Sequence, residues 1–83
     1  MNNKKGITSY KHLNKIIMET LKNSDKKMSA SQINDYICTN FKTSKIKISS
    51  KSIGKRVVLI PQISSEYNSK GIYYYKYDNT INE

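Results

Sequence analysis

The hydrophobic pattern of this 83-residue chain changes its period once, at Pro61. Before Pro61, apolar residues recur about every three or four positions, which is the spacing of one face of a helix. After Pro61, apolar and polar residues alternate, which is typical of strands. A chain of this length buries one small core and is expected to form one domain. The pattern therefore predicts an α+β domain in which helices precede a β-hairpin.

Two helices are expected in the first half of the chain. Residues 8–23 carry apolar residues at helical spacing, and the segment starts with a threonine and a serine that can act as N-caps. Residues 27–41 contain Ser29 followed by Gln32, in the spacing of a capping box. The residues "KKM" before this second helix can form a short extra strand that joins the hairpin.

A third helix is expected over residues 50–60, because Ser49 can cap its start and Pro61 ends it. Three apolar residues fall on one face, which we expect to be buried: Ile53, Val57 and Ile60. The opposite face is mostly polar and basic, and it carries Lys51, Ser52, Lys55 and Leu59, with Arg56 at its edge.

The turn of the expected hairpin is "NSKG", residues 68–71, in which the glycine can adopt a positive φ. A loop of these four residues pairs Tyr67 with Ile72 and turns Tyr74 toward the core. Three other tyrosines then face outward or lie at the edge: Tyr73, Tyr75 and Tyr77. A register slip of one residue would exchange these roles. Tyr73 and Tyr75 can cover the hairpin against the first helix, stack on bases or form a homodimer surface.

Three helices followed by a hairpin is the element order of a winged helix-turn-helix domain, which we expect over residues 8–77. The short strand before the second helix would belong to the same sheet as the hairpin, or wing. Residues 1–7 and 78–83 are expected to be flexible ends.

Two motifs, "SSKSIGKRVVLI" and "NSKGIYYY", resemble the third helix and wing of the regulatory factor X type of winged helix. They are also similar to the C-terminal winged helices of some viral and plasmid primase-helicases. The shared features are a serine at the helix start, the step Ile53-Gly54-Lys55, and an Asn-Ser-Lys wing followed by aromatic residues. The resemblance covers residues 49–77 and implies DNA binding. The factor X type further implies a wing that reads bases while the helix holds the backbone.

The charge of the chain is strongly unbalanced, with 15 basic and 6 acidic residues. Residues 1–77 carry a net charge of +11, because two of the acids, Asp78 and Glu83, lie after them. A lysine-rich codon bias would explain many lysines and asparagines, but it would not explain the scarcity of acids. The balance therefore indicates a polyanionic partner, which we expect to be nucleic acid.

The candidate DNA-binding residues come from four segments. Basic and hydroxyl side chains on the third helix can reach base edges or phosphates in the major groove, and the start of the second helix can offer N–H groups to a phosphate. The wing tip can reach a neighbouring phosphate or the minor groove, and the loop before the third helix adds positive charge. In chain order, the candidates are Ser31, Lys45, Lys47, Lys51, Ser52, Lys55, Arg56, Asn68, Ser69 and Lys70.

Several classes of function have no support in the sequence. One cysteine, Cys38, and one histidine, His12, are too few for a zinc site or a disulfide framework. We expect no cofactor, no small-molecule ligand and no enzyme activity, because the acids are scattered and no glycine-rich phosphate loop is present. We also expect no membrane partner and an intracellular location, because neither a membrane-spanning stretch nor a signal peptide is recognised.

The leading expectation is a small double-stranded DNA-binding protein, either a transcriptional regulator or a plasmid, phage or viral partition or replication factor. A homodimer fits this expectation, since one half-site gives limited affinity. Val58 and Leu59 are expected to be packing residues or part of a dimer contact. Two alternatives stay open. One is a protein-interaction module in a larger assembly, and the other is a binder of single-stranded nucleic acid or RNA.

Overall fold

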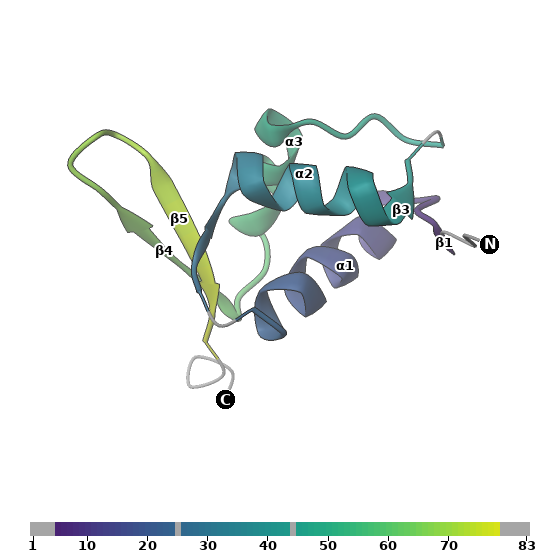
Figure 1. The fold of residues 1–83 in the computed structure, drawn as a ribbon. Helices are drawn as coiled ribbons and strands as arrows, with labels where there is room; N and C mark the ends of the chain where they lie inside the picture. Colours follow the sequence, from purple (N-terminus) through teal and green to yellow (C-terminus); the bar gives the residue numbers. More distant parts are fainter. Residues whose placement is uncertain (1–4, 25, 44, 79–83) are drawn as a thin grey trace.

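The computed structural model of this protein describes residues 5–24, 26–43 and 45–78. These residues form an α+β structure with three helices and a small antiparallel three-stranded sheet, as the sequence predicts (Figure 1). In chain order, the elements are β1 (Lys5–Gly6), α1 (Tyr10–Lys22), β2 (Met28–Ser29), α2 (Ala30–Asn40), β3 (Phe41–Lys42), α3 (Ser50–Val57), β4 (Ile63–Tyr67) and β5 (Tyr73–Tyr77).

The starts of α2 and α3 are both fixed by capping boxes. The Ser29 hydroxyl accepts a hydrogen bond from the Gln32 N–H, and the Gln32 side chain accepts one from the Ser29 N–H. Ser49 and Ser52 make the same reciprocal pair at α3. Each box satisfies N–H groups that the first turn of a helix cannot pair internally. Local sequence therefore sets where both helices begin.

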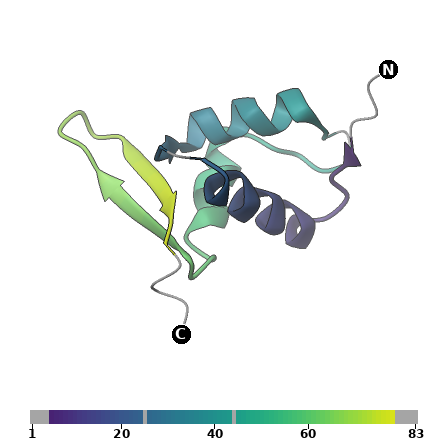
Figure 2. The ribbon, with the colours of Figure 1, turned by 60° about the horizontal axis from the view of Figure 1, so that its bottom comes forward.

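The sheet has the strand order β2-β5-β4, and all its pairs are antiparallel. β2 pairs Met28 with Tyr75 and Ser29 with Tyr74. A short strand before the second helix is therefore present, but it covers Met28–Ser29 and shares only Met28 with the expected segment "KKM". The β4–β5 hairpin extends beyond this pairing and projects away from the helices (Figures 1 and 2). Its base is therefore tied to the helical body, whereas its tip stands apart from it.

The predicted hairpin register is wrong by one residue. Tyr67 pairs with Tyr73, so the loop comprises residues 68–72. Asn68 explains the longer loop, because its side-chain oxygen accepts hydrogen bonds from the N–H groups of Lys70 and Ile72. Gly71 adopts the expected positive φ of 82°.

The shift in register exchanges the two faces of β5. Tyr75 is only 7% exposed and belongs to the core, whereas Tyr74 lies on the opposite face beside Lys27. Tyr77, which was expected to point outward, is partly buried against the core. The core is therefore closed by Tyr75 and not by Tyr74.

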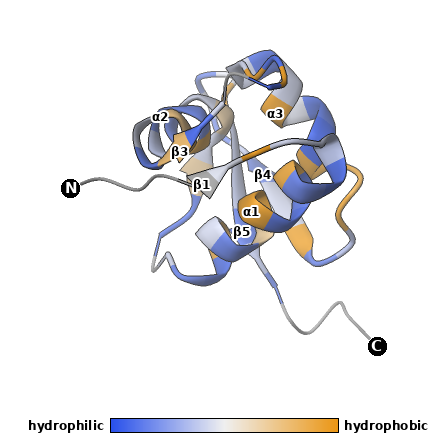
Figure 3. Ribbon diagram, turned by 90° about the vertical axis from the view of Figure 1, so that its right-hand side faces the viewer, coloured by the Kyte–Doolittle hydropathy of each residue, from blue (hydrophilic) through white to orange (hydrophobic). Residues whose placement is uncertain are grey.

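The hydrophobic core lies between the helices and the base of the hairpin. Each helix buries one apolar face, so hydrophobic and hydrophilic stretches alternate along α1 and α3 (Figure 3). The fully or almost fully buried apolar residues are Ile7, Leu13, Ile16, Ile17, Leu21, Ile33, Ile37, Ile53, Val57, Ile60 and Tyr75. All three residues predicted for the buried face of the third helix are among them, but α3 ends at Val57 and not at residue 60, so Ile60 is buried just beyond the helix.

Residues 1–7 were predicted to be a flexible end, but residues 5–7 contact the rest of the domain. β1 pairs in parallel with β3 at the end of the molecule away from the hairpin (Figure 1). Ile7 is fully buried and its N–H donates to the Lys42 carbonyl. Residues 1–4 and 79–83 of the predicted flexible ends lie outside the described residues, and the Asp78 N–H donates to the Gln62 carbonyl.

Candidate nucleic-acid interface

The orientation of α3 is set by its apolar face. Ile53 and Val57 are buried against the rest of the core, so the helix turns its other side to solvent. Lys51 and Lys55 are exposed on that side, as the helical wheel predicts. Both ammonium groups are therefore free to approach a large anionic partner such as a nucleic-acid backbone.

The surroundings of α3 are free of acidic residues over a long stretch of sequence. No Asp or Glu occurs from Tyr36 to Ser65, whereas six basic residues do. They are Lys42, Lys45, Lys47, Lys51, Lys55 and Arg56. Lys45 and Lys47 are exposed in the loop before α3. The stretch of sequence that contains α3 therefore carries positive charges and no negative ones.

Arg56 was expected to contact DNA, but its guanidinium group contacts the ring of Tyr10. Its guanidinium carbon lies 4.9 Å from the centroid of the Tyr10 ring, in a cation–π contact with α1. The Tyr10 hydroxyl in turn donates to the Lys47 carbonyl over 3.3 Å. Arg56 therefore helps to hold the loop and α1 beside α3, and it is less free than Lys51 or Lys55 to reach a base.

Ser52 and Asn68 also have local roles that the sequence prediction missed. The Ser52 hydroxyl donates to the Ser49 carbonyl over 2.9 Å and accepts from the Ser49 N–H. The Asn68 side-chain oxygen is used to close the hairpin loop. Ser69 and Lys70 at the loop tip remain exposed. Of the polar tip residues, Lys70 is the one that offers charge to a partner.

A groove separates the hairpin from the first turns of α2 and α3, and we call it the helix–hairpin groove. It has a volume of about 490 Å³. Its lining residues are Ser29, Ala30, Ser31, Ser50 and Lys51 on the helical side, and Gly71, Ile72, Tyr73 and Tyr75 on the hairpin side. Among these described residues, Lys51 is the one charged group. The groove therefore brings two predicted binding residues, Ser31 and Lys51, close to the hairpin tyrosines.

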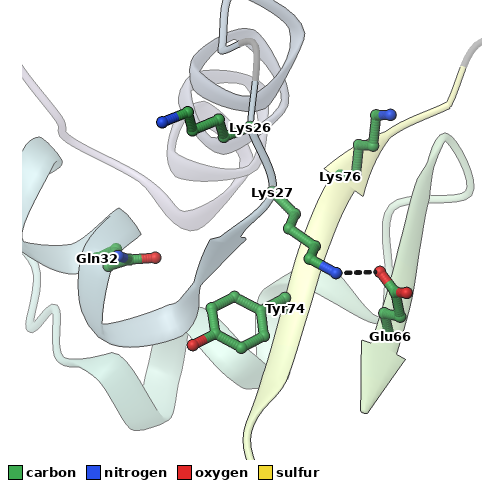
Figure 4. Close-up of a pocket in the computed structure, with 6 residues that line it drawn as sticks. All are labelled: Lys26, Lys27, Gln32, Glu66, Tyr74 and Lys76. Atoms are coloured by element: carbon green, nitrogen blue, oxygen red, sulfur yellow. Dashed lines mark hydrogen bonds and ion pairs between the residues drawn. The ribbon is translucent and has the colours of Figure 1, made fainter. Parts of the chain in front are cut away.

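A second pocket lies on the other face of the hairpin (Figure 4). It has a volume of about 510 Å³ and is lined by Lys26, Lys27, Gln32, Glu66, Tyr74 and Lys76. The Lys27 ammonium lies 2.7 Å from Glu66 Oε1 and 5.8 Å from the Tyr74 ring centroid. This pocket was not foreseen, because Lys27 and Glu66 come from segments far apart in the sequence. Glu66 in this pocket is already paired with Lys27, one of the three lysines that line it.

The ion pair in this pocket gives a testable pH dependence. The hydrogen bond from Lys27 and its positive charge hold the pKa of Glu66 below the ordinary value of 4.5. A lowered carboxyl pKa adds stability above the ordinary pKa, and this stability is lost as the pH falls through the lowered one. NMR titration of the Glu66 carboxyl should give a midpoint below 4.5, and Lys27→Ala should move it back up. An unchanged midpoint in Lys27→Ala would contradict the ion pair.

Comparisons with known proteins add no relative: no family model, no curated protein and no solved structure matches the chain. Within the described residues, His, Cys, Asp and Glu do not gather in any group of three that could hold a metal ion. The helices of the same residues are all too short or too polar to cross a membrane. A proposal about function therefore has to be based on the charge and shape of the surface around α3 and the hairpin.

Proposed function

We propose that this chain is a winged helix-turn-helix protein that binds double-stranded DNA. In this proposal α3 enters the major groove, the β4–β5 hairpin is the wing, and β2 is the short strand that completes the wing sheet. The observation that carries the proposal is the exposed basic side of α3, with Lys51 and Lys55, within an acid-free stretch of sequence and beside a projecting hairpin. A protein of this kind serves as a transcriptional regulator or as a replication or partition factor.

The dimensions of the two partners support the proposal. The major groove of B-DNA is about 12 Å wide and admits one α-helix. α3 is anchored by Ile53 and Val57, so its exposed side can enter the groove without disturbing the core. Lysine ammonium groups there can reach guanine acceptors or phosphates. The projecting hairpin would then lie along the adjacent backbone, with Lys70 at its tip.

The dependence of affinity on salt tests the proposal directly. About five to seven phosphate contacts should give a log–log slope of roughly −5 to −6, because each contact releases condensed counterions. Affinity should then fall about 1,000- to 4,000-fold between about 50 and 200 mM salt. Fluorescence anisotropy with a labelled duplex measures this slope.

Two alanine variants serve as a matched pair in the same experiment. Lys47→Ala, in the loop before α3, should reduce the slope by about 1. Lys15→Ala removes the same charge from α1, where Lys15 lies beside Glu19 and Phe41, and it should leave the slope unchanged. A nearly flat slope for the unmodified protein would contradict the DNA proposal.

One observation favours a second candidate function, a protein-interaction module. Val58 and Leu59, directly after α3, are 73% and 61% exposed. Adjacent exposed apolar residues are a feature of protein contact sites. This function predicts weak DNA binding with a salt slope much shallower than about −5, so the anisotropy experiment separates the two candidates.

A further inference from the structure

Tyrosine side chains form a continuous surface along one face of the hairpin. Tyr67 and Tyr73 are paired across the strands, with ring centroids 4.6 Å apart. Tyr73 and Tyr75 lie nearly parallel, with centroids 6.5 Å apart and an interplanar angle of 16°. Tyr75 is buried in the core, whereas Tyr67 and Tyr73 are 62% and 51% exposed. The aromatic surface therefore runs from the core outward to the exposed part of the hairpin.

Tyr75 and Tyr67 pack within the domain, whereas Tyr73 also lines the helix–hairpin groove. Tyr75 fills the core, and the Tyr67 hydroxyl lies so close to Gly71 that an added Cβ there would be 3.3 Å away. Tyr67 thus packs on the hairpin loop. Tyr73 gains a cross-strand aromatic contact, which stabilises a hairpin modestly, but it also lines the helix–hairpin groove. Half of its surface is still exposed to solvent.

The helix–hairpin groove combines the two features that a nucleotide requires. Its hairpin wall is aromatic, with Tyr73 and Tyr75, and its helical wall carries Lys51 and the hydroxyl-bearing residues Ser31 and Ser50. A base can stack on an aromatic ring whatever its identity, while a lysine binds its phosphate. The volume of about 490 Å³ lies in the range of about 300–1,000 Å³ that is usual for ligand sites.

The second pocket makes a useful contrast. It also joins a tyrosine to lysines, but Glu66 lies within it and already pairs with Lys27. An incoming phosphate would compete with that carboxylate and be repelled by it. The helix–hairpin groove has no acidic residue among its described lining residues. Charge complementarity therefore favours the groove as the nucleotide site.

Bases inside a duplex are stacked on each other and cannot lie on Tyr73. We propose that the helix–hairpin groove takes one unpaired nucleotide, with its base on Tyr73 and its phosphate near Lys51, so that the protein prefers duplex DNA with a single-stranded extension over blunt duplex. This inference rests on the proposed function and deepens it. α3 would hold the duplex, and the groove would hold the first unpaired nucleotide beyond its end.

The test compares four DNA probes by anisotropy: a blunt duplex, the same duplex with a 5′ extension, the same duplex with a 3′ extension, and the extended strand alone as single-stranded DNA. One extension should bind about 5- to 150-fold more tightly than the blunt probe, the range expected for one base stacked on an aromatic ring. The fluorescent base 2-aminopurine, placed at the first unpaired position, should be quenched on binding.

The variants separate stacking from folding. Tyr73→Val keeps a residue that favours strands and should abolish the preference and the quenching, while blunt duplex still binds. Tyr73→Phe should keep both, because stacking does not need the hydroxyl. Tyr74→Val changes the neighbouring tyrosine on the opposite face and should also keep the preference. Thermal melting is the control for folding, and each variant should melt close to the unmodified protein.

Each outcome bears on one proposal or on both. Equal affinity for blunt and extended probes, or a preference that survives Tyr73→Val, overturns the groove inference and leaves duplex binding in place. Binding of single-stranded DNA without binding of blunt duplex overturns the proposed function but supports the groove. Failure to bind any probe at low salt overturns both.

Discussion

Replacing Ile53 with aspartate is expected to unfold the domain. Ile53 is 0% exposed and lies on the buried face of α3. A carboxylate there loses its hydration without gaining a partner, which costs several kcal/mol or forces the group to become protonated. A domain of this size is stabilised by only about 4–12 kcal/mol. Circular dichroism should therefore show a large loss of helix or a melting transition lowered by tens of degrees.

A control in the same helix separates the buried position from the new charge. Lys51→Asp places an aspartate on the exposed side, in the first turn of α3, where a negative charge is favourable to the helix. This variant should melt close to the unmodified protein. If Ile53→Asp also melted there, the helix phase that places Lys51 and Lys55 on the surface would be wrong.

Local signals made the helices predictable from the sequence. The capping boxes at Ser29 and Ser49 need only residues within one turn, so they fix the starts of α2 and α3 before any tertiary contact is known. The spacing of Ile53 and Val57 then determined which side of α3 is exposed. The same argument placed Lys51 and Lys55 correctly on that side.

Features that depend on side-chain choices or distant segments were not predictable in the same way. The hairpin register depended on whether the Asn68 side chain would join the loop, and a shift of one residue exchanges every side chain between the faces. The β1–β3 pair joins two short strands separated by two helices. The contact between Arg56 and Tyr10 and the ion pair between Lys27 and Glu66 likewise join separate elements.

The same distinction applies within the candidate site. Ser52 was expected to contact a base because of its position on the helical wheel. In the structure its hydroxyl instead donates to the Ser49 carbonyl, as part of the N-terminal cap of α3. Exposure can be derived from helical phase alone. Availability of a hydroxyl requires knowledge of its hydrogen bonds, so lysines, which have no acceptor and few local partners, are the better predicted candidates.

The second prediction with a large effect concerns which element contacts the bases of DNA, α3 or the hairpin, and which contacts the backbone. Under the proposed function, Lys55 contacts a base edge and Lys70 contacts the backbone. This assignment follows from two positions: Lys55 is on the exposed side of α3, and Lys70 is in the loop of residues 68–72. The hairpin that ends in this loop projects from the helices (Figure 1). A cognate duplex is first obtained by selection from a random pool, and a scrambled duplex of the same length serves as the reference.

Lys55→Ala should weaken binding to the cognate duplex by about 1–3 kcal/mol, which is about 5- to 150-fold, and should relax discrimination at one base pair. Lys70→Ala should weaken cognate and scrambled duplexes alike and reduce the salt slope by about 1. Both side chains are exposed, so neither change should lower the melting temperature appreciably. Measuring both variants on both duplexes therefore separates base recognition from backbone contact.

The reverse division of work has a distinct signature in the same experiment. If the hairpin reads bases and α3 holds the backbone, Lys70→Ala removes discrimination, whereas Lys55→Ala only weakens all binding uniformly. The hairpin tip offers few groups for such reading, because the Asn68 side-chain oxygen is already bonded within the loop and Lys70 is the charged side chain there. A lysine contacts phosphate wherever it meets the backbone, but it discriminates bases only where a groove holds it against their edges. α3 has a fixed orientation through its buried face, so we expect Lys55 to be the residue that is held in this way.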